Sequence, residues 1–279
     1  MNEASLRSHL LEIAEQDFRL PPASQQAILV RSMLEHIGTP DAELRDRLIY
    51  RTFSKWILGD SFAPDQLREL AEMALDERHL FHHVGMPEDD SVFTRSFSVL
   101  LLGLTVGAHR HRPFLDAAEL AHMRDRLVLY LARERDRRGH VAGKGWAHAV
   151  AHAADVLDEF VQCAEFGPAD ILAILAAVQD QAASEECVYI HEEDERLSVI
   201  VTSAIQRAVL SPDEIGGWLR RWVELAAHKT EFPAEYYRFI NIKNVLQSLY
   251  VRCHRYGIAE SFRTALAETL DTVLRIYSL

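Results

Sequence analysis

Two histidines and an aspartate, closely spaced in one predicted helix, are the residues with the clearest potential for chemistry. His148 and His152 are four residues apart, and Asp155 follows three residues later. Residues three or four apart lie side by side on a helix, so the three side chains would form one polar strip. Two imidazoles at this spacing can hold a divalent metal ion, with a carboxylate as a further ligand. Without metal, they could exchange protons near neutral pH or hold a polar ligand.

The same residues also fit an ordinary amphipathic helix. The predicted core face opposite the strip consists of Val150, Ala154, Leu157 and Val161. The motif is not H-E-x-x-H, so it lacks the glutamate that serves as general base in metalloproteases. Three interpretations therefore stay open: a hydrogen-bonded strip, a pocket for a small ligand, and a metal site held by His148 and His152.

The segment before this helix, Gly139–Trp146, is rich in glycine and contains Lys144. Glycines allow the backbone to come close to another group, and a lysine beside a helix N-terminus favours an anion. Trp146 and Lys144 are therefore candidate ligand-binding residues. The alternative is a glycine-rich turn that ends in a buried Trp146.

A second candidate segment opens the helix predicted after Tyr189. Its acidic residues suit a helix N-terminus, but Glu193 projects onto the same face as the apolar Leu197 and needs a polar partner there. Hypothesis: Glu193 or Asp194 meets His148, His152 or Lys144 across a shared cleft. Non-additive effects of His152 and Glu193 substitutions would support this contact, and strictly additive effects would exclude it.

Three segments resemble an uncharacterised bacterial family, domain of unknown function 2785. They are GKGWAHAVAHAAD at Gly143–Asp155, EDERL at Glu193–Leu197 and FTRSFSVLLL at Phe93–Leu102. The resemblance covers roughly residues 90–210 and implies an all-α protein without a known activity. It groups six residues as one set: Trp146, His148, His152, Asp155, Glu193 and Arg196.

The elements that position these residues are predicted to be helices, because almost every segment has a 3.6-residue apolar period. About twelve helices are expected, starting near residues 3, 22, 40, 64, 90, 116, 146, 168, 191, 212, 233 and 258. Short connections favour antiparallel neighbours, so we predict one all-α domain over residues 1–279, an α/α superhelix similar to HEAT or armadillo repeats. A closed α/α toroid is the alternative.

Composition limits the range of partners and locations. The 279 residues carry a net charge of −12, which disfavours nucleic acid. The longest apolar run, Val99–Ala108, is half of the roughly 20 residues of a membrane helix, so no membrane contact is expected. Three cysteines without a C-x-x-C pair fit a soluble, cytoplasmic protein.

Other polar and aromatic segments have simpler explanations. The run Arg133–Arg138 alternates with acids and is expected to be a solvated helix end. Trp218 and Trp222 are spaced for core packing, and Ala234–Ile240 is expected to form an aromatic seam.

The prediction that combines these features is a helical-repeat protein that binds a small polar or charged ligand. The site would contain His148, His152 and Asp155, with Lys144, Trp146, Glu193, Asp194 and Arg196 as contributors and a divalent metal ion as a candidate cofactor. One alternative is a hydrolase that uses the same histidines, with or without metal. The other is a scaffold that binds a partner protein.

Overall fold

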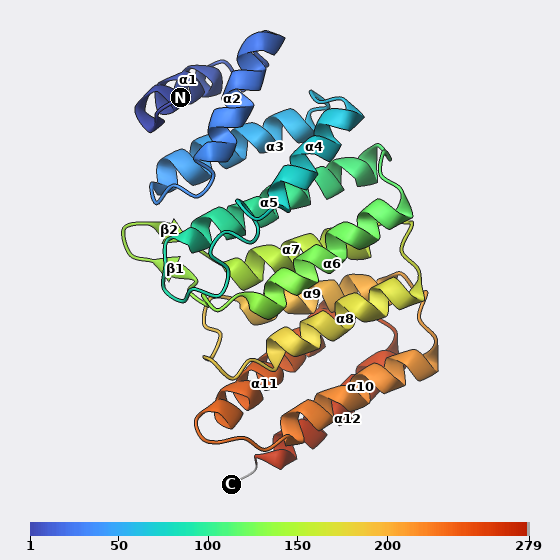
Figure 1. The fold of residues 1–279 in the computed structure, drawn as a ribbon. Helices are drawn as coiled ribbons and strands as arrows, with labels where there is room; N and C mark the ends of the chain where they lie inside the picture. The colour runs from blue at the N-terminus through green and yellow to red at the C-terminus, as the bar shows by residue number, and fades with distance from the viewer. Residues whose placement is uncertain (278–279) are drawn as a thin grey trace. The chain divides into compact units, whose positions relative to one another are not determined.

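The protein is all-α, as the sequence predicts. A computed structural model describes residues 1–277, and within this range it contains twelve α-helices, one π-helix and one two-stranded hairpin (Figure 1). Its contacts divide the chain into two compact units, Met1–Val156 (unit 1) and Leu157–Leu279 (unit 2). The single domain, the superhelical arrangement of repeats and the alternative toroid stay predictions.

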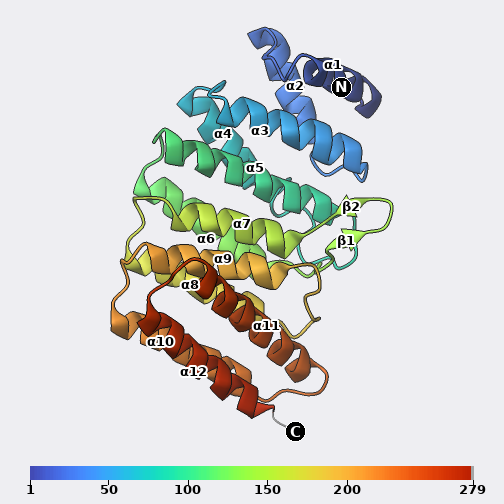
Figure 2. The ribbon, with the colours of Figure 1, turned by 180° about the vertical axis from the view of Figure 1, so that it is seen from behind.

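Unit 1 contains the N-terminal helices and the hairpin. Its elements are α1 (Glu3–Glu15), α2 (Ala23–Glu35), η1 (Glu43–Tyr50), α3 (Arg51–Leu58), α4 (Pro64–Ala74), α5 (Ser91–His111), α6 (Ala117–Arg133), β1 (His140–Val141) and β2 (Gly145–Trp146). Helix α7 (Ala149–Val161) begins in unit 1 and crosses into unit 2. Helices α3 and α4 both pack against α5, and the two ribbon views show this arrangement (Figures 1 and 2).

Unit 2 consists of helices joined by loops. They are α8 (Pro168–Ala182), α9 (Glu193–Gln206), α10 (Pro212–Ala227), α11 (Ala234–Arg255) and α12 (Glu260–Ile276). Helix α9 packs on α11, and α12 packs on both α10 and α11. Trp218 and Trp222 of α10 are buried with their rings edge to face, which confirms their predicted place in the core.

The helix starts follow the capping signals in the sequence. All twelve predicted starts lie within three residues of an observed one, counting η1 with α3 as one element. Asp116 and Glu119 form a capping box at α6, as do Ser211 and Glu214 at α10. Just before η1, the Asp41 carboxylate accepts the backbone N–H groups of Glu43 and Leu44.

A π-helical segment replaces the regular helix predicted from residue 40. Residues Glu43–Tyr50 form η1, which continues directly into α3. π-Helices are rare and are often found at functional sites. The two residues of η1 that matter below are Arg45, which is fully buried, and Asp46, which is partly exposed.

Helix α5 is the central apolar element of unit 1. Among the described residues, it is the one helix with the length and composition to cross a membrane, and 72% of its most apolar window is buried inside the protein. A buried core helix of a soluble protein meets the same test, so the observation is weak evidence for a membrane span. The packing of α3 and α4 against α5 accounts for its apolar character.

Candidate functional site

A β-hairpin forms in the glycine-rich segment Gly139–Trp146. Strands β1 and β2 are antiparallel, with His140 opposite Trp146. Val141 packs against the buried side chains of Val92 and Phe93. Trp146 is 42% exposed, so the alternative of a turn ending in a buried tryptophan is wrong.

Gly145 lets the hairpin come close to η1, as the glycines of this segment suggest. Its φ of +81° is a conformation that L side chains rarely adopt. A Cβ atom at this position would lie 2.9 Å from the Cβ of Ala42 and 3.1 Å from a guanidinium nitrogen of Arg45. The hairpin backbone therefore rests directly on η1, and only glycine fits at the contact.

Arg45 connects the hairpin to the segment before η1. Its side chain is 0% exposed and donates hydrogen bonds to the carbonyls of Thr39 (2.9 Å) and Lys144 (2.8 Å). The guanidinium carbon lies 4.2 Å from the ring centroid of Phe93 and 4.7 Å from that of Phe97. Cation–π contacts of this kind are strongest when the cation is shielded from water.

The charge of Arg45 is balanced by Asp46. The Nε of Arg45 lies 2.9 Å from Oδ1 of Asp46. Burial lowers the pKa of Arg45, and Asp46 opposes this shift. Burial raises the pKa of Asp46, while the neighbouring guanidinium acts to lower it. The guanidinium of Arg45 is therefore a buried cation that lies against two aromatic rings. The carboxylate of Asp46, its counter-charge, stays in contact with water.

Four aromatic side chains form the tryptophan–histidine cluster: His140, Trp146, His148 and His152. The Trp146 ring centroid lies 5.0 Å from that of His140 and 4.2 Å from that of His148. The His148 and His152 centroids are 5.7 Å apart, and His152 meets Phe97 edge to face at 5.5 Å. The cluster thus runs from the partly exposed indole of the hairpin to the aromatic rings that hold Arg45.

His148 has a different backbone from the one predicted. Helix α7 begins at Ala149, so His148 lies just before the helix rather than within it, with a φ of +48°. Its carbonyl accepts the N–H of His152, which places the two imidazoles near each other despite this difference. Left-handed backbone is uncommon outside glycine, although histidine tolerates it better than most residues. Such strain is concentrated at functional sites.

The rest of α7 keeps the predicted core face. Val150, Ala154, Leu157 and Val161 are all buried. On the opposite side, His152, Asp155 and Glu159 are half-buried rather than fully solvated. Asp155 lies on α7 three residues after His152.

Lys144 pairs with a carboxylate of the protein itself. Its Nζ lies 2.6 Å from a carboxylate oxygen of Asp90, which directly precedes α5. Both side chains are about 40% exposed (40% and 39%). The lysine therefore links the tip of the hairpin to the start of α5, and its charge is largely balanced.

The acidic candidates of unit 2 have local partners. Glu193 is 3% exposed, and its carboxylate accepts the N–H of His191 at 2.8 Å. Asp194 accepts a hydrogen bond from the hydroxyl of Ser248 on α11 at 2.7 Å. Arg196 is exposed in the first turn of α9. The contact of Glu193 or Asp194 with the histidines or Lys144 stays a prediction.

A metal site has little support from the surrounding side chains. Within residues 1–277, no group of three or more His, Cys, Asp or Glu side chains is arranged to hold a metal ion. His148 and His152 would supply two ligands, so metal binding at this pair stays a prediction.

The sequence missed the residues that support the cluster. Arg45 and Asp46 come from a segment that showed no motif, and His140 lies in the glycine-rich segment Gly139–Trp146 but was not among the proposed site residues. Their roles arise from contacts between distant segments, such as the bond from Arg45 to Lys144, 99 residues away. Gly145 could have indicated that the hairpin contacts another segment, because a glycine in a short polar segment often marks a close backbone approach.

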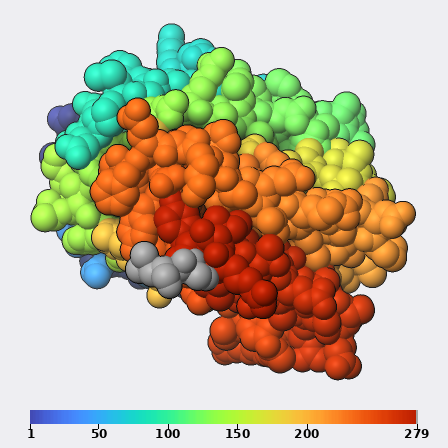
Figure 3. All heavy atoms as spheres, turned by 90° about the horizontal axis from the view of Figure 1, so that it is seen from below, coloured from blue at the N-terminus to red at the C-terminus, as the bar shows by residue number. Residues whose placement is uncertain are grey.

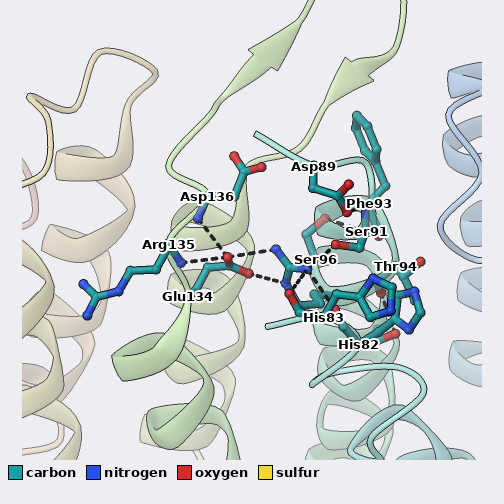
Figure 4. Close-up of polar contacts among 12 residues, drawn as sticks. His82, His83, Asp89, Ser91, Phe93, Thr94, Ser96, Glu134, Arg135 and Asp136 are labelled. Carbon is teal, nitrogen blue, oxygen red and sulfur yellow. Dashed lines mark hydrogen bonds and ion pairs between the residues drawn. The ribbon is translucent and has the colours of Figure 1, made fainter. Parts of the chain in front are cut away.

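A second buried network organises the chain before the hairpin (Figure 4). Arg95 of α5 and Glu134 are both 0% exposed and are joined by two hydrogen bonds of 2.5 and 2.9 Å. Glu134 also accepts the N–H groups of Arg135 and Asp136. Burial acts to lower the pKa of Arg95, but Glu134 more than offsets this, so the pKa is raised.

This network corrects the prediction of a solvated helix end at Arg133–Arg138. Helix α6 does end at Arg133, but Glu134 and Asp136 are buried. The Asp136 carboxylate pairs with Arg138 at 2.6 Å, and Arg138 also donates to the carbonyl of Asp89. The backbone carbonyls of Arg138 and Gly139 then accept the N–H groups that enter α7. The buried acids therefore fix the path from α6 to the hairpin.

Arg95 also holds the loop between α4 and α5. It donates to the carbonyls of His82 (2.8 Å) and His83 (3.3 Å), whose rings stack with centroids 4.2 Å apart. Burial, His83 and Arg95 lower the pKa of His82 from 6.5, and Asp89 opposes this. Between the lowered pKa and 6.5, the unfolded chain binds more protons than the folded one.

We therefore expect stability to fall as the pH decreases below about 6.5. His82→Gln should flatten this part of the curve, because it removes the imidazole and keeps the carbonyl that accepts from Arg95. Denaturant midpoints between about pH 8 and pH 5 measure the effect. The exposed His111→Gln is the control, and equal curves for His82→Gln and the wild type would contradict this account.

Comparison with known proteins places this arrangement in a family. A family model described as "Protein of unknown function (DUF2785)" matches residues 80–251, which is more than half of the chain. The matched range contains the Arg95 network, the hairpin, the tryptophan–histidine cluster and α8 to α10. Neither the curated proteins nor the solved structures gave a match. The chain therefore belongs to the family described as Protein of unknown function (DUF2785), as the three signature segments suggested.

Proposed function

We propose that the protein binds a small, planar, polar molecule at the tryptophan–histidine cluster. The observation that carries this proposal is a partly exposed indole in ring contact with two imidazoles. Indole faces bind planar or apolar groups with little loss of side-chain entropy. A tryptophan placed this way on a buttressed hairpin is more typical of a recognition surface than of a packing residue.

The imidazoles would select a polar ligand. A neutral histidine carries one N–H donor and one acceptor nitrogen, so His140 and His148 can match donors or acceptors on a planar ring. The nearby charges of Lys144, Arg138 and Arg45 are each paired with an acid. An uncharged or weakly charged heteroaromatic ring therefore suits the cluster better than a strongly charged molecule.

The support beneath the cluster favours binding over a purely structural role. Arg45, Gly145 and the buried acids fix a hairpin whose two strands have only two residues each. Preorganised side chains bind more tightly because less freedom is lost when the ligand arrives. The protein would thus act as a binding module, and a cytoplasmic location stays part of this proposal.

A thermal-shift screen of heteroaromatic metabolites tests the proposal. A ligand that binds only the folded state at about 100 times its Kd should stabilise it by about 2.7 kcal/mol. Trp146→Ala and His148→Asn should abolish the shift. Asparagine is chosen because it accepts the left-handed backbone of His148. His111→Ala, a change of an exposed histidine at the far end of α5, should leave it intact.

Two outcomes would overturn the proposal. One is a screen in which no heteroaromatic compound raises the melting temperature of the wild type. The other is a compound whose full shift survives in both Trp146→Ala and His148→Asn, because the ligand would then bind elsewhere.

A further inference from the structure

Unit 2 carries an exposed aromatic surface that the proposed function does not use. Phe232, in the loop between α10 and α11, is 79% exposed, and Tyr236 on α11 is 42% exposed. We define the aromatic strip as Phe232, Tyr236, Phe239 and Tyr277. Ring centroids are 6.3 Å apart for Phe232 and Tyr236, 6.3 Å for Tyr236 and Tyr277, and 4.3 Å for Phe239 and Tyr277. Figure 3 shows the face of unit 2 formed by α10, α11 and α12 in orange to red.

The ammonium group of Lys229 lies against the aromatic strip. The Nζ of Lys229 lies 5.2 Å from the ring centroid of Tyr277 and 3.9 Å from a carboxylate oxygen of Glu235. The lysine side chain is 70% exposed, so burial does not force it into this position. An aromatic face together with a carboxylate is an environment that attracts ammonium and guanidinium groups.

We propose that the aromatic strip binds a lysine or arginine side chain from a basic segment of a partner protein. In the isolated chain, Lys229 occupies the place that the partner's cation would take. Phe232 and Tyr236 would contact the apolar part of the partner segment, since exposed aromatic residues commonly supply the binding energy of interfaces. Glu231 and Glu235 flank the strip and would attract the basic segment.

A second copy of this chain fits the strip less well than a basic partner. The chain carries a net charge of −12, so two copies would repel each other. The strip and the tryptophan–histidine cluster share no residue, so this inference does not depend on the proposed function. The protein would then have two separate binding sites: the aromatic strip for a partner protein and the tryptophan–histidine cluster for a small ligand.

The test is calorimetric titration of the intact protein with a short synthetic peptide of lysine and leucine. A peptide in which glutamate replaces lysine is the negative control. Phe232→Ser should weaken binding about tenfold, as expected for an aromatic hot spot. The matched control is Val251→Ser, because Val251 is an exposed apolar residue at the other end of α11.

Lys229 gives a more specific readout. If its ammonium occupies the partner's place, Lys229→Met should strengthen binding of the lysine peptide several-fold. Lys55→Met changes the net charge equally on an exposed site of α3 and should have a smaller effect. No binding to the wild type, equal binding by Phe232→Ser, or equal effects of the two lysine changes would each overturn the inference.

Discussion

Glu134→Gln is expected to destabilise the protein by about 3–5 kcal/mol, the largest effect of any single substitution considered. The variant leaves the guanidinium of Arg95 without a counter-charge at a position that is 0% exposed. It also turns an acceptor oxygen into an N–H₂ group that faces the N–H donors of Arg95. The loss should appear as a lower denaturant midpoint with an unchanged slope.

A double-mutant cycle isolates the ion pair within this loss. Combining Arg95→Met with Glu134→Gln should cost clearly less than the sum of the two single changes, because no buried charge then stands alone. Asp271→Asn breaks the exposed pair of Asp271 with Arg275 and should cost less than about 1 kcal/mol. Additive effects of Arg95 and Glu134 would show that the pair does not act as a unit.

Arg45→Met is expected to cost about 3 kcal/mol and to release the hairpin. The estimate is at the low end for a buried pair because Asp46, with 34% of its side chain exposed, can be hydrated. The carbonyls of Thr39 and Lys144 lose their donor, and Phe93 and Phe97 lose the cation between them. Arg45→Lys should give only a partial rescue, because an ammonium lacks the planar fork that reaches both carbonyls.

Hydrogen exchange at the hairpin measures whether Arg45→Met releases it. The N–H of Ala147, which bonds to the carbonyl of Gly139 at 2.8 Å, should exchange much faster in Arg45→Met than in the wild type. Ligand binding at the tryptophan–histidine cluster should weaken in parallel. Unchanged protection of Ala147 would mean that the hairpin does not depend on Arg45.

The helical architecture could be predicted because its signals are local. Apolar periodicity and capping residues such as Asp116 and Ser211 act within one or two turns, and the sequence shows them directly. The π-helix η1 could not be predicted in this way. It has the same apolar pattern as an α-helix, and its packing on α1, α3 and α5 is a tertiary feature.

The site was predicted in part for the same reason. Trp146, His148, His152 and Lys144 lie within nine residues of each other, so one segment brought them into view. Arg45 and the pair of Arg95 with Glu134 act across distances of 39 to 99 residues, and their burial depends on how helices pack. Arg95 offered one usable signal, since a charged residue within an apolar helix needs a buried partner.

Fluorescence quenching at Trp146 directly tests whether a ligand binds at the tryptophan–histidine cluster. Trp56, Trp218 and Trp222 are all at most 6% exposed, so a small planar ligand that stacks on an accessible indole should quench Trp146 selectively. We expect saturable quenching by a heteroaromatic ligand from the thermal-shift screen, and loss of that quenching in Trp146→Phe. Quenching of equal size and affinity in Trp146→Phe would contradict this expectation.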